Sequence, residues 1–170
     1  LLTTANYEVG SVILAREEIP EDVNLIIISS PTTDFSIEEI DKLDAYFNNG
    51  GDAIISMTPQ IGEKLTNLET FLEEWGIRYS EDLVFDSAQS LSGYPMYVVP
   101  NIATVEGVTD NLNTRNQFAL VVGGKAIELT TTEVSGTYVT PLMTSSATSY
   151  AKNVNDVAYG YDQTENDAVG

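Results

Sequence analysis

Six polar side chains follow apolar runs of this sequence and could contact a ligand. They are Ser29, Ser30, Thr32, Thr58, Gln60 and Asp86. In an open α/β sheet, ligands bind beyond the carboxyl ends of the parallel strands. The sequence therefore predicts a binding edge formed by residues 29–33, 57–61 and 86–90. Serine and threonine are also common turn residues, and a purely structural turn is the alternative interpretation.

The residue types limit the chemistry available at this edge. The chain contains no cysteine and no histidine. Thiolate nucleophiles, zinc–thiolate sites and Ser-His-Asp triads are therefore excluded within it. A serine nucleophile would need a carboxylate or a lysine as its base. We expect no catalytic residue and no cofactor.

Neighbouring carboxylates offer the alternative function, a hydrolase acting on carbohydrate. Glycosidases use two carboxyl groups that converge across about 5–9.5 Å. The pairs Glu38–Glu39 and Glu73–Glu74 are adjacent on predicted helices, so their side chains point in different directions. Oxygen-bearing residues over 162–167 are spaced as in some calcium loops, but the glycine at position six and the later glutamate are missing. We therefore predict no metal site.

Two apolar runs and the helix between them must position the binding edge. Leu25–Ile28 is an unbroken apolar run and Ala53–Met57 is a second apolar run that includes Ser56, as expected for strands buried on both faces. Ser36 and Glu39 form a capping box that starts a helix over about 36–48. Gly50 or Gly51 supplies the left-handed residue that ends it. This order predicts a strand–helix–strand unit with parallel strands.

Further elements extend this unit in both directions. A second capping box, Thr66 with Glu69, predicts a helix that ends at Gly76. We expect 77–85 to return to the same sheet as a strand and 6–15 to form its edge. The buried stripe of the second helix consists of Leu65, Leu68, Phe71, Leu72 and Trp75.

The remaining sequence changes character. From 87 to 149 it is rich in Ser, Thr, Gly and Tyr, with short strand-like pieces. These pieces lie at 96–99, 118–122, 126–131 and 138–140. We predict a single α/β domain over 1–150, β-rich from about 87, and a poorly packed acidic tail over 151–170.

Charge narrows the set of partners. Twenty-six acidic and seven basic residues give a formal net charge of −19. Nucleic acid and anionic membrane surfaces would be repelled. No stretch approaches the about 20 apolar residues of a membrane-spanning helix. The chain starts at Leu1 without methionine, so we expect it to be part of a longer protein.

The order of these segments resembles a known family. The strongest part is the pattern S-x-E-E-x-x-x-L-x-x-Y-x-x-x-G-G, which runs from Ser36 to Gly51. It is followed by Trp75-Gly76-Ile77 and, later, by the Thr/Ser-rich stretch 141–150. Over about 17–150 the chain resembles the extracytoplasmic domain of GldG-like proteins, the gliding-motility-type auxiliary components of ABC transporters.

The resemblance implies a fold, a location and partners. The fold would be α/β, with a flavodoxin-like or class I glutamine amidotransferase-like parallel sheet, flanking helices and a β-rich C-terminal part. The domain would lie outside the cytoplasmic membrane and be tethered through segments absent from this chain. Its partners would be an ABC permease and ATPase, and nucleotide hydrolysis would belong to the ATPase because no P-loop motif occurs here. The domain would be non-catalytic and bind a partner protein or a transported ligand, such as a small molecule or carbohydrate.

Overall fold

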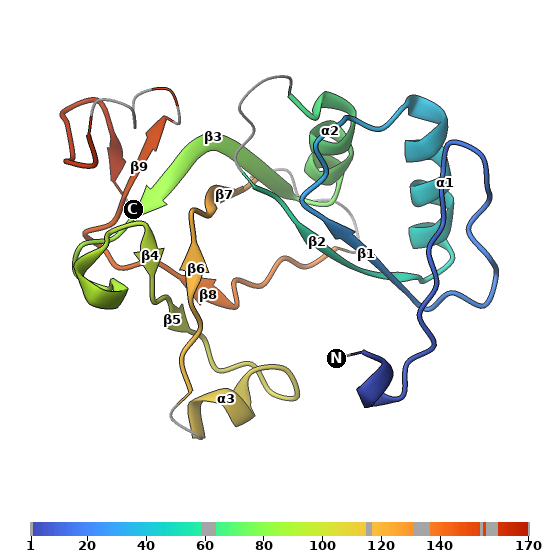
Figure 1. Ribbon diagram of the computed structural model, residues 1–170, viewed down its shortest axis with the longest axis horizontal. Helices are drawn as coiled ribbons and strands as arrows, with labels where there is room; N and C mark the ends of the chain where they lie inside the picture. Colours follow the sequence, from blue (N-terminus) through green and yellow to red (C-terminus); the bar gives the residue numbers. More distant parts are fainter. Residues whose placement is uncertain are drawn as a thin grey trace. The chain divides into compact units, whose positions relative to one another are not determined.

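The chain forms two compact units. The computed structural model describes residues 2–58, 64–114, 117–130, 137–153, 155 and 160–169, with backbone alone at 113 and 114 (Figure 1). The first unit comprises Leu1–Ser56 and Leu65–Leu68. The second comprises Met57–Lys64 and Glu69–Gly170.

The first unit is built on one strand–helix–strand motif. Strand β1 (Leu25–Ser29) pairs in parallel with β2 (Asp52–Ser56), and α1 (Ile37–Asn48) connects them. The register runs from Leu25 opposite Asp52 to Ser29 opposite Ser56. The predicted parallel pair is therefore confirmed. Residues 6–15 form no strand, so the predicted edge strand is wrong; a short 3-10 helix, η1 (Thr3–Ala5), precedes them.

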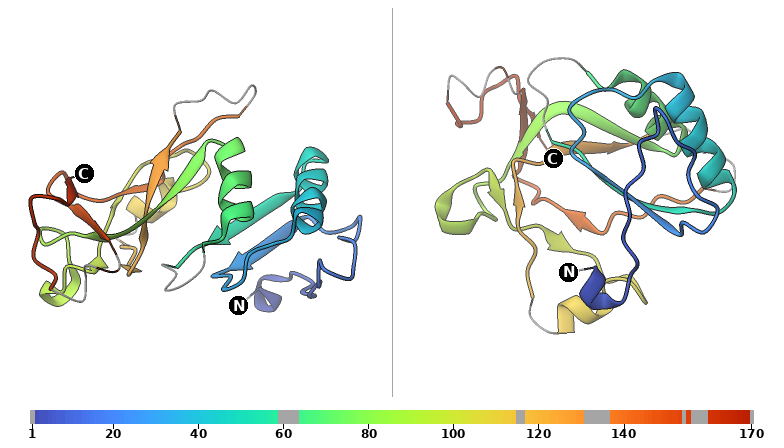
Figure 2. Two further views of the ribbon diagram at one scale, coloured as in Figure 1. Left: turned by 90° about the horizontal axis from the view of Figure 1, so that it is seen from above. Right: turned by 45° about the vertical axis from the view of Figure 1, so that its right-hand side comes forward.

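Local signals set the limits of α1 as predicted. The N–H of Glu39 donates to Ser36 Oγ and the N–H of Ser36 donates to Glu39 Oε2, which completes the capping box. Gly50 has a φ of 85° and ends the helix. In Figure 2, α1 runs along one face of the β1–β2 pair. Leu43 is fully buried, whereas Ile37, a predicted member of the apolar stripe, is exposed.

Helix α2 (Thr66–Glu74) starts with a cap that the sequence did not indicate. The carboxylate of Asp34 accepts the N–H groups of Asn67, at 2.9 Å, and Leu68, at 3.3 Å. Glu69, which was expected to complete a local capping box, instead pairs with Lys125. Four members of the predicted stripe are buried, namely Leu65, Leu68, Phe71 and Leu72.

The second unit is organised around a long strand. Strand β3 (Ile77–Phe85) has the predicted limits and lies between β7 (Lys125–Leu129) and β9 (Tyr150–Asn153). Both pairings are antiparallel, and β10 (Ala168–Val169) continues the sheet beyond β9. Leu83 and Phe85 of β3 pack with Tyr150 and Met96 as a core. The rings of Phe85 and Tyr150 stack with centroids 5.5 Å apart.

Two short ribbons complete the second unit. Strand β4 (Tyr97–Val98) pairs with β6 (Val121–Val122), and β5 (Asn101–Ile102) pairs with β8 (Met143–Thr144). A 3-10 helix, η2 (Leu91–Gly93), and the short helix α3 (Asp110–Thr114) lie in the connections.

The predicted flavodoxin-like or class I glutamine amidotransferase-like parallel sheet is wrong. Among the described strands, only β1 and β2 are parallel, and β3 pairs in a separate antiparallel sheet. The apolar residues Leu83, Val84 and Phe85 predicted a buried strand but not its neighbours. The partners come from residues 125–129 and 150–153. The division into a domain over 1–150 and an acidic tail stays a prediction; Tyr150–Asn153 and Ala168–Val169 lie in one sheet.

Candidate functional site

The end of β1 carries three of the predicted contact residues. Ser29 and Thr32 are exposed, and Ser29 lies opposite Ser56 of β2. The N–H of Ser30 donates to the carbonyl of Ser56 at 2.8 Å, and Ser30 has a φ of 48°. Serine here therefore closes a strained turn as well as presenting a hydroxyl group.

The structure does not assemble all six predicted residues at one sheet edge. Thr58 is exposed just after β2, and Gln60 lies outside the described residues. Asp86 follows β3, which belongs to a different sheet from β1 and β2. Ligand binding at Ser29, Ser30 and Thr32 therefore stays a prediction, as does binding at Thr58 and Gln60.

Asp86 is an internal anchor of the second unit. Its side chain is fully buried, at 0% exposure, and accepts four hydrogen bonds. Its Oδ1 accepts from the N–H of Ala88 and of Gln89, each at 3.0 Å, and from Ser146 Oγ at 2.9 Å. Its Oδ2 accepts from the N–H of Ser146 at 2.7 Å. Asp86 thus ties the turn after β3 to a loop 60 residues later.

These bonds also decide the protonation of Asp86. Burial raises the pKa of the carboxyl group, because the charged form loses hydration. The hydrogen bonds from Ser146, Gln89 and Ala88 favour the charged form, and together they lower the pKa below its ordinary value. A carboxylate held ionised and saturated with donors is suited to a structural role and not to proton transfer.

The two carboxylate pairs considered for hydrolysis are also engaged. Glu39 is part of the capping box of α1. Glu73 accepts from Arg78 Nε at 2.9 Å. In each pair, at least one carboxylate is therefore already bound to another group of the protein. Within the described part of the chain, no three His, Cys, Asp or Glu side chains are grouped as metal ligands.

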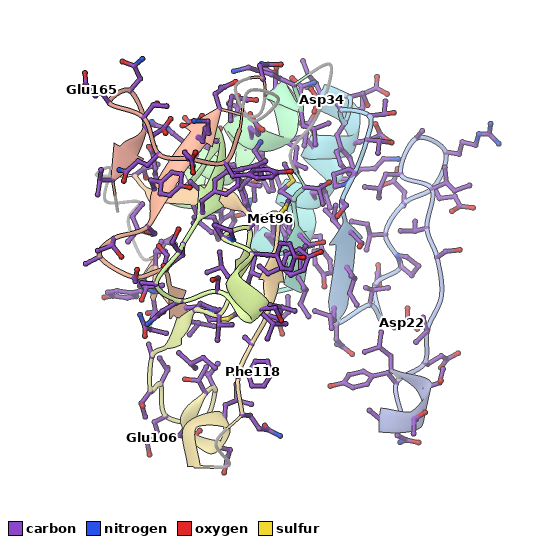
Figure 3. All side chains as sticks on the ribbon, turned by 60° about the vertical axis from the view of Figure 1, so that its left-hand side comes forward. Asp22, Asp34, Met96, Glu106, Phe118 and Glu165 are labelled. Atoms are coloured by element: carbon purple, nitrogen blue, oxygen red, sulfur yellow. The ribbon has the colours of Figure 1, made fainter. Side chains whose placement is uncertain are left out.

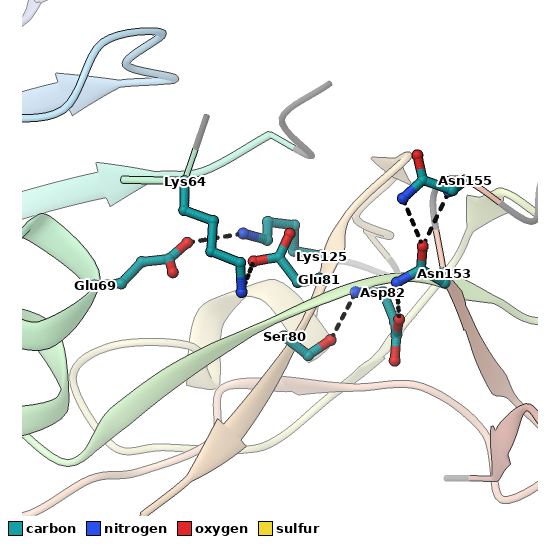
Figure 4. A network of polar contacts seen from close by, with 8 residues as sticks. All are labelled: Lys64, Glu69, Ser80, Glu81, Asp82, Lys125, Asn153 and Asn155. Atoms are coloured by element: carbon teal, nitrogen blue, oxygen red, sulfur yellow. Dashed lines mark hydrogen bonds and ion pairs between the residues drawn. The ribbon is translucent and has the colours of Figure 1, made fainter. Parts of the chain in front are cut away.

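Two buried lysines form ion pairs that the sequence analysis missed. Lys125 Nζ lies 3.0 Å from Glu69 Oε1, with the two side chains 2% and 18% exposed (Figure 4). The same ammonium group lies 6.0 Å from the centroid of the Tyr79 ring. The usable signal was Lys125, the single charged residue in the stretch 118–127, because a buried charge needs a partner.

The second buried pair explains the acidic segment that resembles a calcium loop. Lys152 Nζ lies 3.3 Å from Asp167 Oδ2 and donates to the carbonyl of Asp162 at 3.0 Å. Asp167 also accepts the N–H of Thr164 at 2.7 Å. That bond and the lysine lower the pKa of Asp167 against the opposing effect of burial. Lys152 thus neutralises Asp167, one of the three acidic residues of this loop.

A family model described as an ABC-type uncharacterized transport system matches residues 2–168. The chain belongs to this family. The match covers nearly the whole chain and places it among the auxiliary components of ABC transport systems, as the resemblance implied at the family level. None of the helices described for this family member is both long and apolar enough to cross a bilayer.

One solved structure has a fold similar to that of this family member. The mmIFT52 N-terminal domain is similar with a TM-score of 0.62 over 86% of this chain and 71% of that chain. The sequences are 18% identical, so the likeness concerns the fold alone. Together with the antiparallel sheet around β3, it overturns the flavodoxin-like expectation. No curated protein matches the chain.

Proposed function

We propose that this chain is a non-catalytic, GldG-like domain of an ABC-transporter auxiliary protein, located outside the cytoplasmic membrane. The observation that carries the proposal is the family match over residues 2–168. The domain binds a protein partner of the same transport system, either the permease or a complex of permease and ATPase. In the parent protein it is tethered to the membrane by other segments.

The state of the carboxylates supports a binding role. Asp86 accepts four hydrogen bonds within the protein, Glu39 caps a helix and Glu73 pairs with an arginine. General acid–base catalysis needs a group that can exchange a proton with a substrate, and these groups are committed to internal contacts. The exposed hydroxyl groups of Ser29 and Thr32 are suited to contacting a transported ligand without an activating base.

The proposal is tested by co-purification from the native organism. A tagged parent protein is expressed at its natural level, and the permease and ATPase encoded with it are quantified by mass spectrometry. We expect both subunits to be enriched over a strain with the same tag on an unrelated membrane-anchored protein. Recovery of the parent protein without either subunit would contradict the proposal.

Location and catalysis are tested separately. In intact cells with a permeable outer layer, added protease should cleave this domain but leave a cytoplasmic marker intact. Protection of the domain until the cytoplasmic membrane is broken would place it inside the cell.

Incubation of the domain with polysaccharides should release no reducing ends. Saturable release of reducing ends would favour the alternative function, a carbohydrate hydrolase.

A further inference from the structure

A large part of the second unit is devoid of charge. The stretches 87–105, 117–124 and 137–149 contain no Asp, Glu, Lys or Arg, although 19% of all residues in the chain are charged. We call these three stretches the uncharged lobe. The negative charge of the protein is therefore carried by the rest of its surface.

The three stretches meet in space although they are distant in sequence. Ribbon β4–β6 joins the first stretch to the second, and ribbon β5–β8 joins the first to the third (Figure 1). The N–H of Gly123 donates to the carbonyl of Met96 at 3.1 Å, and the N–H of Ala103 donates to the carbonyl of Leu142 at 2.9 Å. The lobe is thus one connected structure.

Apolar side chains at alternate positions of the lobe are exposed to solvent. Phe118, Leu120 and Val122 are 67%, 41% and 55% exposed. Residues 118–120 form no regular strand but lead directly into β6 (Val121–Val122), and side chains two apart in an extended chain point to the same face, so we treat the three as a stripe. Val121, at the intervening position, is 37% exposed. Figure 3 labels Phe118 on the segment between α3 and β6. Exposed aromatic and aliphatic groups without charges have the composition of the centre of a protein interface.

The backbone beside this stripe is also available. In the described part of the chain, β6 pairs with β4 alone. Because Gly123 donates toward β4, the alternation of an antiparallel pair directs the N–H and C=O groups of Val122 to the opposite side. The backbone groups of 118–120 have no hydrogen-bond partner among the described residues. A strand edge with free donors and acceptors can template a further strand.

We propose that residues 118–122 bind an extended, uncharged segment of a transporter subunit as an added β-strand. Main-chain hydrogen bonds would supply affinity, and alternate apolar side chains of the guest would pack on Phe118, Leu120 and Val122. A charged guest would find no counter-charge in the lobe. A second copy of this chain is disfavoured because each copy carries a net charge of −19. The proposal rests on the proposed function, whose partner it describes.

The test uses a probe of defined chemistry on the full chain. The probe is a peptide of about six alternating valines and threonines, the length of a typical strand, with both ends capped. Amide hydrogen exchange is followed by NMR with and without the peptide. At about ten times its Kd, the peptide should slow exchange of the Leu120 and Val122 amides about tenfold. The edge strand β7, whose Ile127 and Leu129 are exposed but which also carries Lys125 and Glu128, is the internal control and should not change.

Matched variants connect the effect to the stripe. Leu120→Lys should abolish protection, and Ile127→Lys on the control edge should leave it unchanged. Melting temperatures verify that both variants fold; if Leu120→Lys does not, Phe118→Ser replaces it because that side chain is the more exposed.

Three outcomes would overturn the proposal. One is unchanged exchange at 118–122, and another is equal protection at β7. The third is protection without peptide that grows with protein concentration while the chain sediments as a dimer, which would identify a second copy as the occupant. If the peptide test fails while the transporter subunits still co-purify with the parent protein, this docking edge is rejected but the proposed function is not.

Discussion

At the residue scale, the decisive finding is that the carboxylate most expected to act chemically acts structurally. Asp86 was predicted at a ligand-binding edge, yet it accepts four hydrogen bonds in the interior of the second unit. Nothing local in Phe85-Asp86-Ser87 indicated this, because half of its donors come from Ser146. A partner 60 residues away leaves no mark in the local pattern.

Replacing Asp86 should therefore cost stability. Asp86→Ala leaves the partly buried N–H groups of Ala88, Gln89 and Ser146 without their acceptor, and we expect a loss of about 3 kcal/mol in the free energy of unfolding. Urea denaturation monitored by Trp75 fluorescence measures it. Ser29→Ala, an exposed strand-end control, should change stability by less than about 0.5 kcal/mol. Equal effects of the two substitutions would reject the anchoring role.

The lowered pKa of Asp86 predicts the direction of a pH dependence. The pKa is below the ordinary value in the folded chain and near about 3.9 in the unfolded chain. Its stabilisation is therefore complete above the unfolded pKa and is lost as the pH falls through the folded pKa. The difference in stability between the wild type and Asp86→Asn should shrink as urea titrations move from pH 7 to below pH 4. A difference that stays constant would show that the carboxylate does not titrate in this way.

At the element scale, local signals predicted elements but not their partners. The capping box of Ser36 and Glu39, the left-handed Gly50 and the limits of β3 depend on neighbouring residues, and all were predicted from the sequence. The pairing of β3 with β7 and β9 depends on residues between 42 positions (Leu83 with Lys125) and 71 positions (Asp82 with Asn153) away, and a short apolar segment matches many partners equally well. The cap of α2 was missed for the same reason, because Asp34, which accepts the N–H groups of Asn67 and Leu68, lies 33 and 34 residues before them.

The cap on α2 can be tested by one substitution. Asp34→Ala removes the acceptor of the Asn67 and Leu68 N–H groups, and we expect a loss of about 1 kcal/mol. Asp41→Ala, on the exposed surface of α1, is the matched control and should have a smaller effect. Equilibrium unfolding in urea compares the two, and a neutral Asp34→Ala would assign the start of α2 to its own sequence.

The buried pair between α2 and β7 predicts a non-additive pattern. Lys125→Met leaves Glu69 without its partner and should cost about 3 kcal/mol, whereas adding Glu69→Leu should restore much of the loss. The exposed pair Lys64–Glu81 is the control, and Lys64→Met should cost less than about 1 kcal/mol. A double-mutant cycle in urea measures the coupling. Additive losses would mean that the two charges are not coupled.

At the scale of the whole molecule, charge is segregated. The chain has a net charge of −19, but the uncharged lobe of the second unit contains none of the charged residues. Like charge keeps copies of the protein apart, while the lobe provides a surface on which an apolar partner can bind without losing ion hydration. This arrangement fits a family member that works beside other subunits of a transport system.

The central claim is that this domain binds its transporter and does no chemistry of its own. Its most direct test is the equilibrium binding of the 170-residue chain to the purified cognate permease, held in discs of neutral lipid. We predict saturable binding at one chain per permease complex and no binding to discs that contain lipid alone. Absence of binding to the permease, in the presence and absence of the ATPase subunit, would contradict the account.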